Sequence, residues 1–160
     1  MSNTIDSTKY RKSDLALAYS MMGEVFASKD LNKDADTYFR KGTHLMPFIM
    51  DYKIKYGSFL LKNNRKEDAT KVFNQALELN PTIKEIHLNL GYIAILNQDF
   101  ITAENGLKQA IALDPDYVLA YENLVLSAQI QNKIEDTKLY LHKILEIAPN
   151  HKAKLILENL

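Results

Sequence analysis

All four prolines of the chain fall on one arithmetic series. They stand at Pro47, Pro81, Pro115 and Pro149, each 34 residues after the one before. Proline disfavours helical geometry in the preceding residue and is tolerated in the first turn of a helix, so it separates one helix from the next. A fixed spacing of this size indicates one supersecondary element that is used four times. The prolines therefore mark the joints of a repeated structure.

Further columns repeat when the chain is written at this period. The four rows start at Ala16, Met50, Lys84 and Val118. Apolar columns in each row are separated by three, four or seven positions, as they are on one face of an amphipathic helix. A short polar turn, such as Asn63–Arg65, divides each row in two. We therefore expect each row to form two helices joined by a turn.

The eighth column is small in three rows, where it holds Gly23, Gly57 and Gly91, and it becomes Val125 in the fourth. A glycine inside a helix costs roughly 1 kcal/mol relative to alanine. Two antiparallel helices can approach closely where one presents a small side chain to a large side chain of the other. We therefore expect the helices of a row to pack closely at these glycines.

This pattern of columns resembles the tetratricopeptide repeat (TPR) family, whose repeat has 34 residues and two helices. The resemblance covers residues 14–149. It implies an all-α fold, a right-handed α-solenoid of four helix–turn–helix repeats at about residues 16–49, 50–83, 84–117 and 118–149.

The two ends fit the same interpretation. A stacked repeat leaves an apolar face uncovered at its last element, so repeat arrays need a cap. Within residues 150–160, apolar residues fall on one side of a helix, and we expect a ninth, capping helix there. Residues 1–13 are expected to form a polar N-terminal tail.

No motif in the chain predicts catalysis or a cofactor. There is no cysteine, which excludes disulfides and thiol chemistry. The four histidines lack the paired spacing of a zinc site; His142 and His151, close together at the end of the array, are only a weak metal candidate, and His87 is expected to be structural. Phosphate-binding loops and nucleophile motifs are missing. We therefore expect a non-enzymatic protein without a cofactor, a catalytic residue or a metal site.

Charge and hydropathy argue against nucleic acid and membrane as partners. Twenty basic and twenty acidic residues give a net charge of zero, whereas nucleic-acid recognition needs a concentrated basic surface. The chain has no apolar run of membrane-spanning length and no secretory signal. We expect a cytoplasmic protein that binds neither nucleic acid nor membrane.

The resemblance to the TPR family also implies a binding surface. In that family the concave face, which is lined by the first helix of each repeat, binds an extended peptide. Here this face is apolar in rows three and four, and an exposed apolar patch usually marks an interaction site. The candidate binding residues are Ile54, Lys55, Leu88, Asn89, Tyr92, Ile95, Leu119, Asn123 and Leu126. A side-chain amide can donate to and accept from a peptide backbone, and Asn89 and Asn123 resemble the asparagine ladder of O-GlcNAc transferases.

Our leading hypothesis is a scaffold or adaptor that binds an extended peptide or a partner helix on the concave face. One alternative is a structural protein that self-assembles through the ends of the array, so a homo-oligomer is possible. Another is a regulatory or targeting TPR domain of a larger protein, such as an O-GlcNAc-transferase-like enzyme. The carboxylate clamp of chaperone-binding TPR domains is not expected, because Glu24 and Glu85 occupy clamp positions and would repel a carboxylate.

Overall fold

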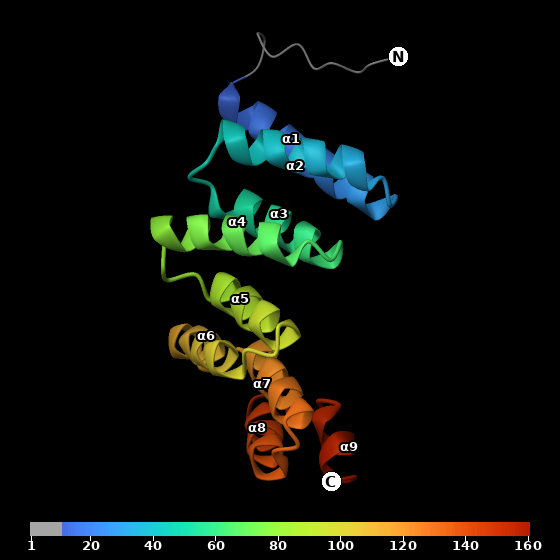
Figure 1. Cartoon of the computed structure of the whole chain (residues 1–160), viewed down its shortest axis with the longest axis vertical. Coiled ribbons are helices and arrows are strands. Elements are labelled where there is room, and N and C mark those ends of the chain that lie inside the picture. Colours follow the sequence, from blue (N-terminus) through green and yellow to red (C-terminus); the bar gives the residue numbers. More distant parts are fainter. Residues whose placement is uncertain (1–10) are drawn as a thin grey trace. The chain divides into compact units, whose positions relative to one another are not determined.

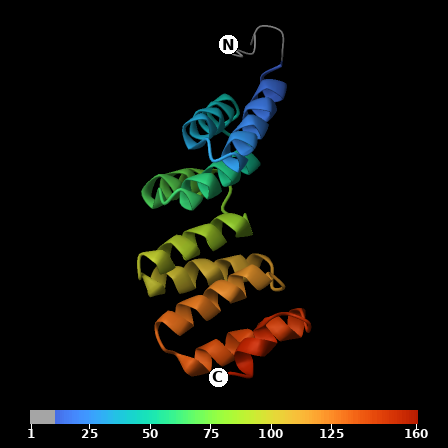
Figure 2. The same cartoon turned by 90° about the vertical axis from the view of Figure 1, so that its right-hand side faces the viewer.

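The computed structural model describes residues 11–160, which form helices and turns without a strand. The chain divides into two compact units, Met1–Leu79 (unit 1) and Asn80–Leu160 (unit 2). Unit 1 contains α1 (Lys12–Ser28), α2 (Asn32–Leu45), α3 (Met50–Lys62) and α4 (Lys66–Leu79). Unit 2 contains α5 (Lys84–Leu96), α6 (Phe100–Leu113), α7 (Val118–Ile130), α8 (Ile134–Ile147) and α9 (Ala153–Leu157). Figure 1 labels these helices, and Figure 2 shows them turned by 90°.

The expected all-α fold is confirmed: within residues 11–160, four helical hairpins are followed by a ninth helix. The ninth helix, α9, has five residues and is shorter than the expected stretch of residues 150–160. At the other end, residues 1–10 of the expected tail lie outside the described residues, and α1 begins at Lys12. No helix among residues 11–160 combines the length and the apolar character needed to cross a membrane.

One residue column ends the first helix of all four hairpins in the left-handed conformation. The column holds Asp30, Asn64, Gln98 and Asn132, whose φ angles lie between 56° and 60°. The next amide then donates to the carbonyl five residues back, as from Leu31 to Phe26 at 3.0 Å and from Arg65 to Leu60 at 2.9 Å. This Schellman arrangement satisfies carbonyl groups that the helix end would leave unpaired. It turns the chain by the same route in every hairpin.

The two helices of a hairpin meet where the eighth column faces the twenty-fourth, which holds Phe39, Phe73, Leu107 and Leu141. A Cβ atom added at Gly57 would lie 2.5 Å from the ring of Phe73, and one added at Gly23 would lie 2.8 Å from the ring of Phe39. Real Cβ contacts are longer, so both rings occupy the space that the glycine leaves. The expected close packing at these glycines is confirmed.

The same contact recurs in unit 2 with smaller partners. A Cβ atom at Gly91 would lie 2.9 Å from Leu107. In the last hairpin, Val125 and Leu141 are buried in one apolar cluster. Leucine therefore faces glycine in the third hairpin and valine in the fourth, so the same two columns meet in both hairpins with different side chains.

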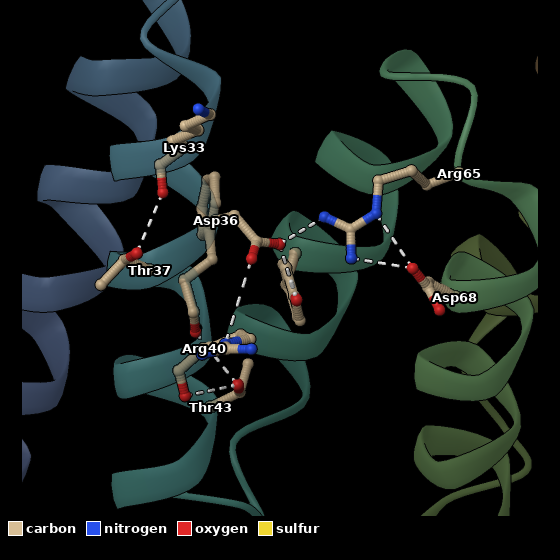
Figure 3. Close-up of polar contacts among 9 residues, drawn as sticks. Lys33, Asp36, Thr37, Arg40, Thr43, Arg65 and Asp68 are labelled. Carbon is tan, nitrogen blue, oxygen red and sulfur yellow. Dashed lines mark hydrogen bonds and ion pairs between the residues drawn. The ribbon is translucent and has the colours of Figure 1, made fainter.

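A polar cluster joins the two hairpins of unit 1, as Figure 3 shows. Asp36 of α2 accepts a hydrogen bond from the Tyr56 hydroxyl of α3 at 2.9 Å and one from Arg65 Nη1 at 2.6 Å. Arg65 also donates to Asp68 of α4 through Nε at 2.9 Å and Nη2 at 2.8 Å. Burial, reinforced by the hydrogen bond to Asp36, raises the pKa of Tyr56. Asp36 thus satisfies a buried hydroxyl and a guanidinium at once.

Replacing Gly57 with alanine tests the packing of the hairpin. Helix propensity alone would stabilise this variant by about 1 kcal/mol, but the added methyl group overlaps the Phe73 ring. We expect a net loss of about 1 kcal/mol or more in the free energy of unfolding, measured by urea denaturation. Phe73→Leu in the same chain should recover part of the loss. The double variant should then lose less free energy of unfolding than the two single variants lose together. A gain in stability for Gly57→Ala would contradict the close contact.

Two substitutions at Asp36 separate its two contacts. Asp36→Ala removes the only hydrogen-bond acceptor that the described residues offer to the Tyr56 hydroxyl, as well as a partner of Arg65. We expect it to lower the free energy of unfolding by about 1–3 kcal/mol. Asp36→Asn keeps an acceptor for the hydroxyl and should cost less. Equal losses for the two variants would show that the Tyr56 hydroxyl gains no stability from Asp36.

Candidate functional site

Six of the nine candidate binding residues gather on the surfaces of α5 and α7, two helices that contact each other in unit 2. Leu88 and Leu126 are half-buried and pack on a core cluster that includes Leu107 and Leu124. Tyr92 is also half-buried, and 51% of Leu119 is exposed. We call this surface the α5–α7 face and define it by Leu88, Asn89, Tyr92, Leu119, Asn123 and Leu126.

The apolar surface continues at the ends of both helices. Leu96, the last residue of α5, is 43% exposed, and Ile130, the last residue of α7, is 49% exposed. Both helices therefore present apolar side chains beyond the residues that were expected to bind. Leu88 and Leu126 contact the core and hold this surface in place, whereas the side chain of Leu119 is exposed to solvent.

Ile95 does not share this surface. Only 2% of it is exposed, and it belongs to the buried core cluster with Ala94 and Leu124. Its side chain stabilises helix packing and cannot reach a ligand on the outside. The expectation that Ile95 lines a binding surface is corrected accordingly: its column lies at the edge between the exposed and buried sides of the helix, and in α5 it turns inward.

The two asparagines differ in their hydrogen bonding. Asn89 Nδ2 donates to the backbone carbonyl of Glu85 at 2.7 Å, one helical turn earlier. Asn123 is half-buried, and its side chain makes no hydrogen bond to any residue in the range 11–160. Asn123 therefore keeps its full capacity to donate and accept, whereas Asn89 keeps its oxygen and one N–H.

The remaining candidates, Ile54 and Lys55, belong to α3 of unit 1. Ile54 is half-buried. Lys55 Nζ lies 2.8 Å from Glu24 Oε1 of α1 and 3.2 Å from Asp51 Oδ2 of its own helix. Hydrogen bonding to Glu24 raises the pKa of Lys55. The ammonium group therefore already has two carboxylate partners within unit 1.

A second polar cluster borders the α5–α7 face and could not be found from sequence spacing. Glu122 Oε1 of α7 lies 3.3 Å from His151 Nε2 and 3.2 Å from Lys152 Nζ. Beside it, a groove of about 170 Å³ runs between α7 and α9, with Leu126 and Ile156 among its lining residues. Glu122 and His151 are 29 positions apart in the sequence and share no motif, so no local pattern predicts that they meet.

The histidines of the described chain have structural partners or stand apart. His87 Nε2 donates to the Pro81 carbonyl at 2.7 Å, which ties α5 to the preceding turn. His151 Nδ1 accepts from the Ala153 amide at 3.1 Å, and His142 is exposed on α8. Within residues 11–160, no three side chains of histidine, cysteine, aspartate or glutamate gather as metal ligands would.

A sequence profile described as "Tetratricopeptide repeat" matches residues 51–83. Curated protein sequences gave no significant match. Among solved structures, PilW, described as a widely conserved type IV pilus biogenesis factor, is 25% identical with a TM-score of 0.77. That alignment covers 87% of this chain and 64% of the PilW chain, so this chain spans less than two thirds of that relative.

Two further solved structures share the fold. YrrB, described as a TPR protein with an unusual peptide-binding site, is 23% identical with a TM-score of 0.75, over 97% of this chain and 77% of YrrB. The pilF protein of Pseudomonas aeruginosa is 19% identical with a TM-score of 0.79, over 92% of this chain and 68% of pilF. A tetratricopeptide repeat is therefore matched at residues 51–83, and the helical hairpins of the chain share the fold of these solved structures.

Proposed function

We propose that this protein is a non-enzymatic interaction module and that the α5–α7 face binds an extended peptide segment of a partner protein. The apolar character of this face carries the proposal. Single exposed apolar side chains are normal on protein surfaces, but a contiguous group usually marks an interaction site. Here α5 and α7 contact each other, and both carry exposed or half-buried apolar side chains, with Leu119 at 51% exposure and Ile130 at 49%.

An extended peptide fits this surface better than a partner helix does. A helix satisfies its own backbone N–H and C=O groups, whereas an extended chain offers them to its surroundings. Asn123 has an amide without a hydrogen-bond partner among residues 11–160, and it lies among the apolar residues of the face. Its oxygen and its N–H groups can pair with a peptide backbone while leucine and tyrosine side chains bury the peptide's apolar groups.

In unit 1, Ile54 and Lys55 stay predicted binding residues, separate from the α5–α7 face. Because Glu24 and Asp51 already hold the Lys55 ammonium, an acidic peptide group would have to compete with both. The solved structure of YrrB supports peptide binding by likeness, since that protein is described as having a peptide-binding site. The partner is proposed to be a protein or peptide, and a cytoplasmic location stays a prediction.

Leu119→Glu is the sharpest test of the α5–α7 face, because Leu119 is exposed and its loss should not disturb the core. Leu139→Glu on α8 is a matched control, since Leu139 is 53% exposed and lies outside the face. Peptides selected from a display library on the wild-type protein would be measured against both variants by fluorescence anisotropy. We expect Leu119→Glu to weaken binding about tenfold or more, since it loses a buried leucine contact, and Leu139→Glu to leave it unchanged.

Circular dichroism and the melting temperature would establish that both variants remain folded. Wild-type affinity in the Leu119→Glu variant, or an equal loss in both variants, would contradict binding on the α5–α7 face.

A second candidate function, self-assembly, is favoured by α1. Leu17, Met21 and Val25 recur every four residues and are 49%, 55% and 52% exposed. In α3, Phe59 has the same column as Val25, and its ring lies 5.1 Å from Phe39 of the preceding hairpin. Among the described residues, the apolar stripe of Leu17, Met21 and Val25 is exposed. A second copy of the chain could cover it.

Met21→Glu tests this candidate, because it places a charge in the middle of the stripe. If the stripe mediates self-assembly, the wild-type mass measured by multi-angle light scattering rises with concentration. The Met21→Glu variant should then stay monomeric over the same range, since burying an unpaired carboxylate is unfavourable. The Leu139→Glu variant should behave as the wild type does. A wild-type protein that is monomeric throughout would rule out self-assembly.

A further inference from the structure

A groove of about 690 Å³ opens on unit 1, on helices that the α5–α7 face does not use. Arg40, Lys41 and His44 of α2 line it, together with Lys53 of α3 and Gln75 of α4. None of its lining residues among residues 11–160 carries a carboxylate. The groove therefore combines enough room for a small ligand with a one-sided excess of positive charge.

Lys53 is the unusual member of this group. Its column is aromatic in the other rows, where it holds Tyr19, His87 and Tyr121. Only 7% of Lys53 is exposed, and its ammonium has no ion pair or hydrogen bond with any residue in the range 11–160. Burial lowers the pKa of Lys53. Lys53 lines the groove, so its ammonium is partly desolvated and has no counter-ion among residues 11–160. Partial desolvation of an unpaired charge is unfavourable, and an anion in the groove would compensate it.

Arg40 and Lys41 also carry positive charge that is not fully neutralised within the protein. Arg40 Nε lies 4.0 Å from Asp36 Oδ2, but that carboxylate already accepts hydrogen bonds from Tyr56 and Arg65. Figure 3 shows dashed lines from Asp36 to both Arg40 and Arg65. Lys41 Nζ lies over aromatic rings, 5.4 Å from the centroid of Tyr19 and 5.3 Å from that of Tyr38. Ring faces orient this ammonium without neutralising it.

We propose that this groove binds a phosphoryl group, with Lys53 at its base and Arg40 and Lys41 at its sides. Three cations and one shared carboxylate leave about two positive charges, which match the charge of −1.5 to −2 that a phosphate monoester carries near pH 7. A carboxylate would neutralise only one of them. Guanidinium and ammonium groups are also the usual donors to phosphate oxygens. The phosphoryl group could belong to free phosphate or to a phosphorylated side chain. The same cationic side chains would bind the phosphate oxygens in both cases.

Phosphate titration of the wild-type protein and of two lysine variants tests this site. Lys53→Met removes the ammonium of Lys53 and keeps an apolar side chain of similar length. Lys62→Met is the matched control, because Lys62 is an exposed residue of the same helix, outside the groove. Inorganic phosphate would be titrated by calorimetry and by amide NMR shifts, with chloride adjusted to hold the ionic strength constant. We expect Lys53→Met to weaken binding about tenfold or more, and Lys62→Met to bind as the wild type does.

Thermal stability separates loss of binding from loss of folding. In chloride, Lys53→Met should melt at the wild-type temperature or higher, since a desolvated charge is gone. Phosphate should raise the melting temperature of the wild type and of Lys62→Met, and not that of Lys53→Met. The proposal is overturned if phosphate has no effect on the wild type beyond that of chloride, or if Lys53→Met binds phosphate with wild-type affinity.

A phosphoserine peptide and its unphosphorylated form distinguish the two sources of the phosphoryl group. Tighter binding of the phosphopeptide than of inorganic phosphate assigns the groove to a modified side chain. Equal affinities assign it to free phosphate, and both results support the site. Equal binding of the phosphorylated and unphosphorylated peptides would overturn it. Because these residues lie in unit 1, Leu119→Glu should leave phosphate binding unchanged. The phosphate site is therefore tested separately from peptide binding in unit 2.

Discussion

The fit of one large side chain against one small position holds each hairpin together. In unit 1 the rings of Phe39 and Phe73 fill the space over Gly23 and Gly57, and a β-carbon there would overlap them. The closeness of the two helices, and hence the directions of all their other side chains, depends on this contact. In unit 2 the same contact pairs Gly91 with Leu107, and the last hairpin buries Val125 and Leu141 in one apolar cluster.

The fold could be predicted from the sequence because its main determinants recur at one period. The proline series located the joints, and the columns of small and large residues predicted which helix faces meet. The polar turns were recognisable too, since aspartate or asparagine holds the left-handed position in three of the four, at Asp30, Asn64 and Asn132. These features all lie within one hairpin, where a spacing along the chain translates directly into a place on a helix.

Contacts between hairpins could not be predicted in the same way, because residues of one column have different neighbours in different rows. Lys53 occupies a packing column but ends in a groove without a counter-ion. Ile95 was expected on the binding surface and is a core residue. Asn89 bonds to its own helix whereas Asn123 does not. Which carboxylate Arg65 reaches depends on how successive hairpins stack, and no spacing between Asp36 and Arg65 encodes it.

The sixteen-residue separation between the paired columns, as from Gly57 to Phe73, bears on how the chain folds. Chains whose contacts are local close small loops at little entropic cost and reach their folded state quickly. Each hairpin can therefore nucleate by itself, and the stability of the array is approximately a sum over hairpins and their interfaces. Such a protein should unfold first at a terminal hairpin. Amide hydrogen exchange should therefore be faster in the terminal hairpins than in the central ones.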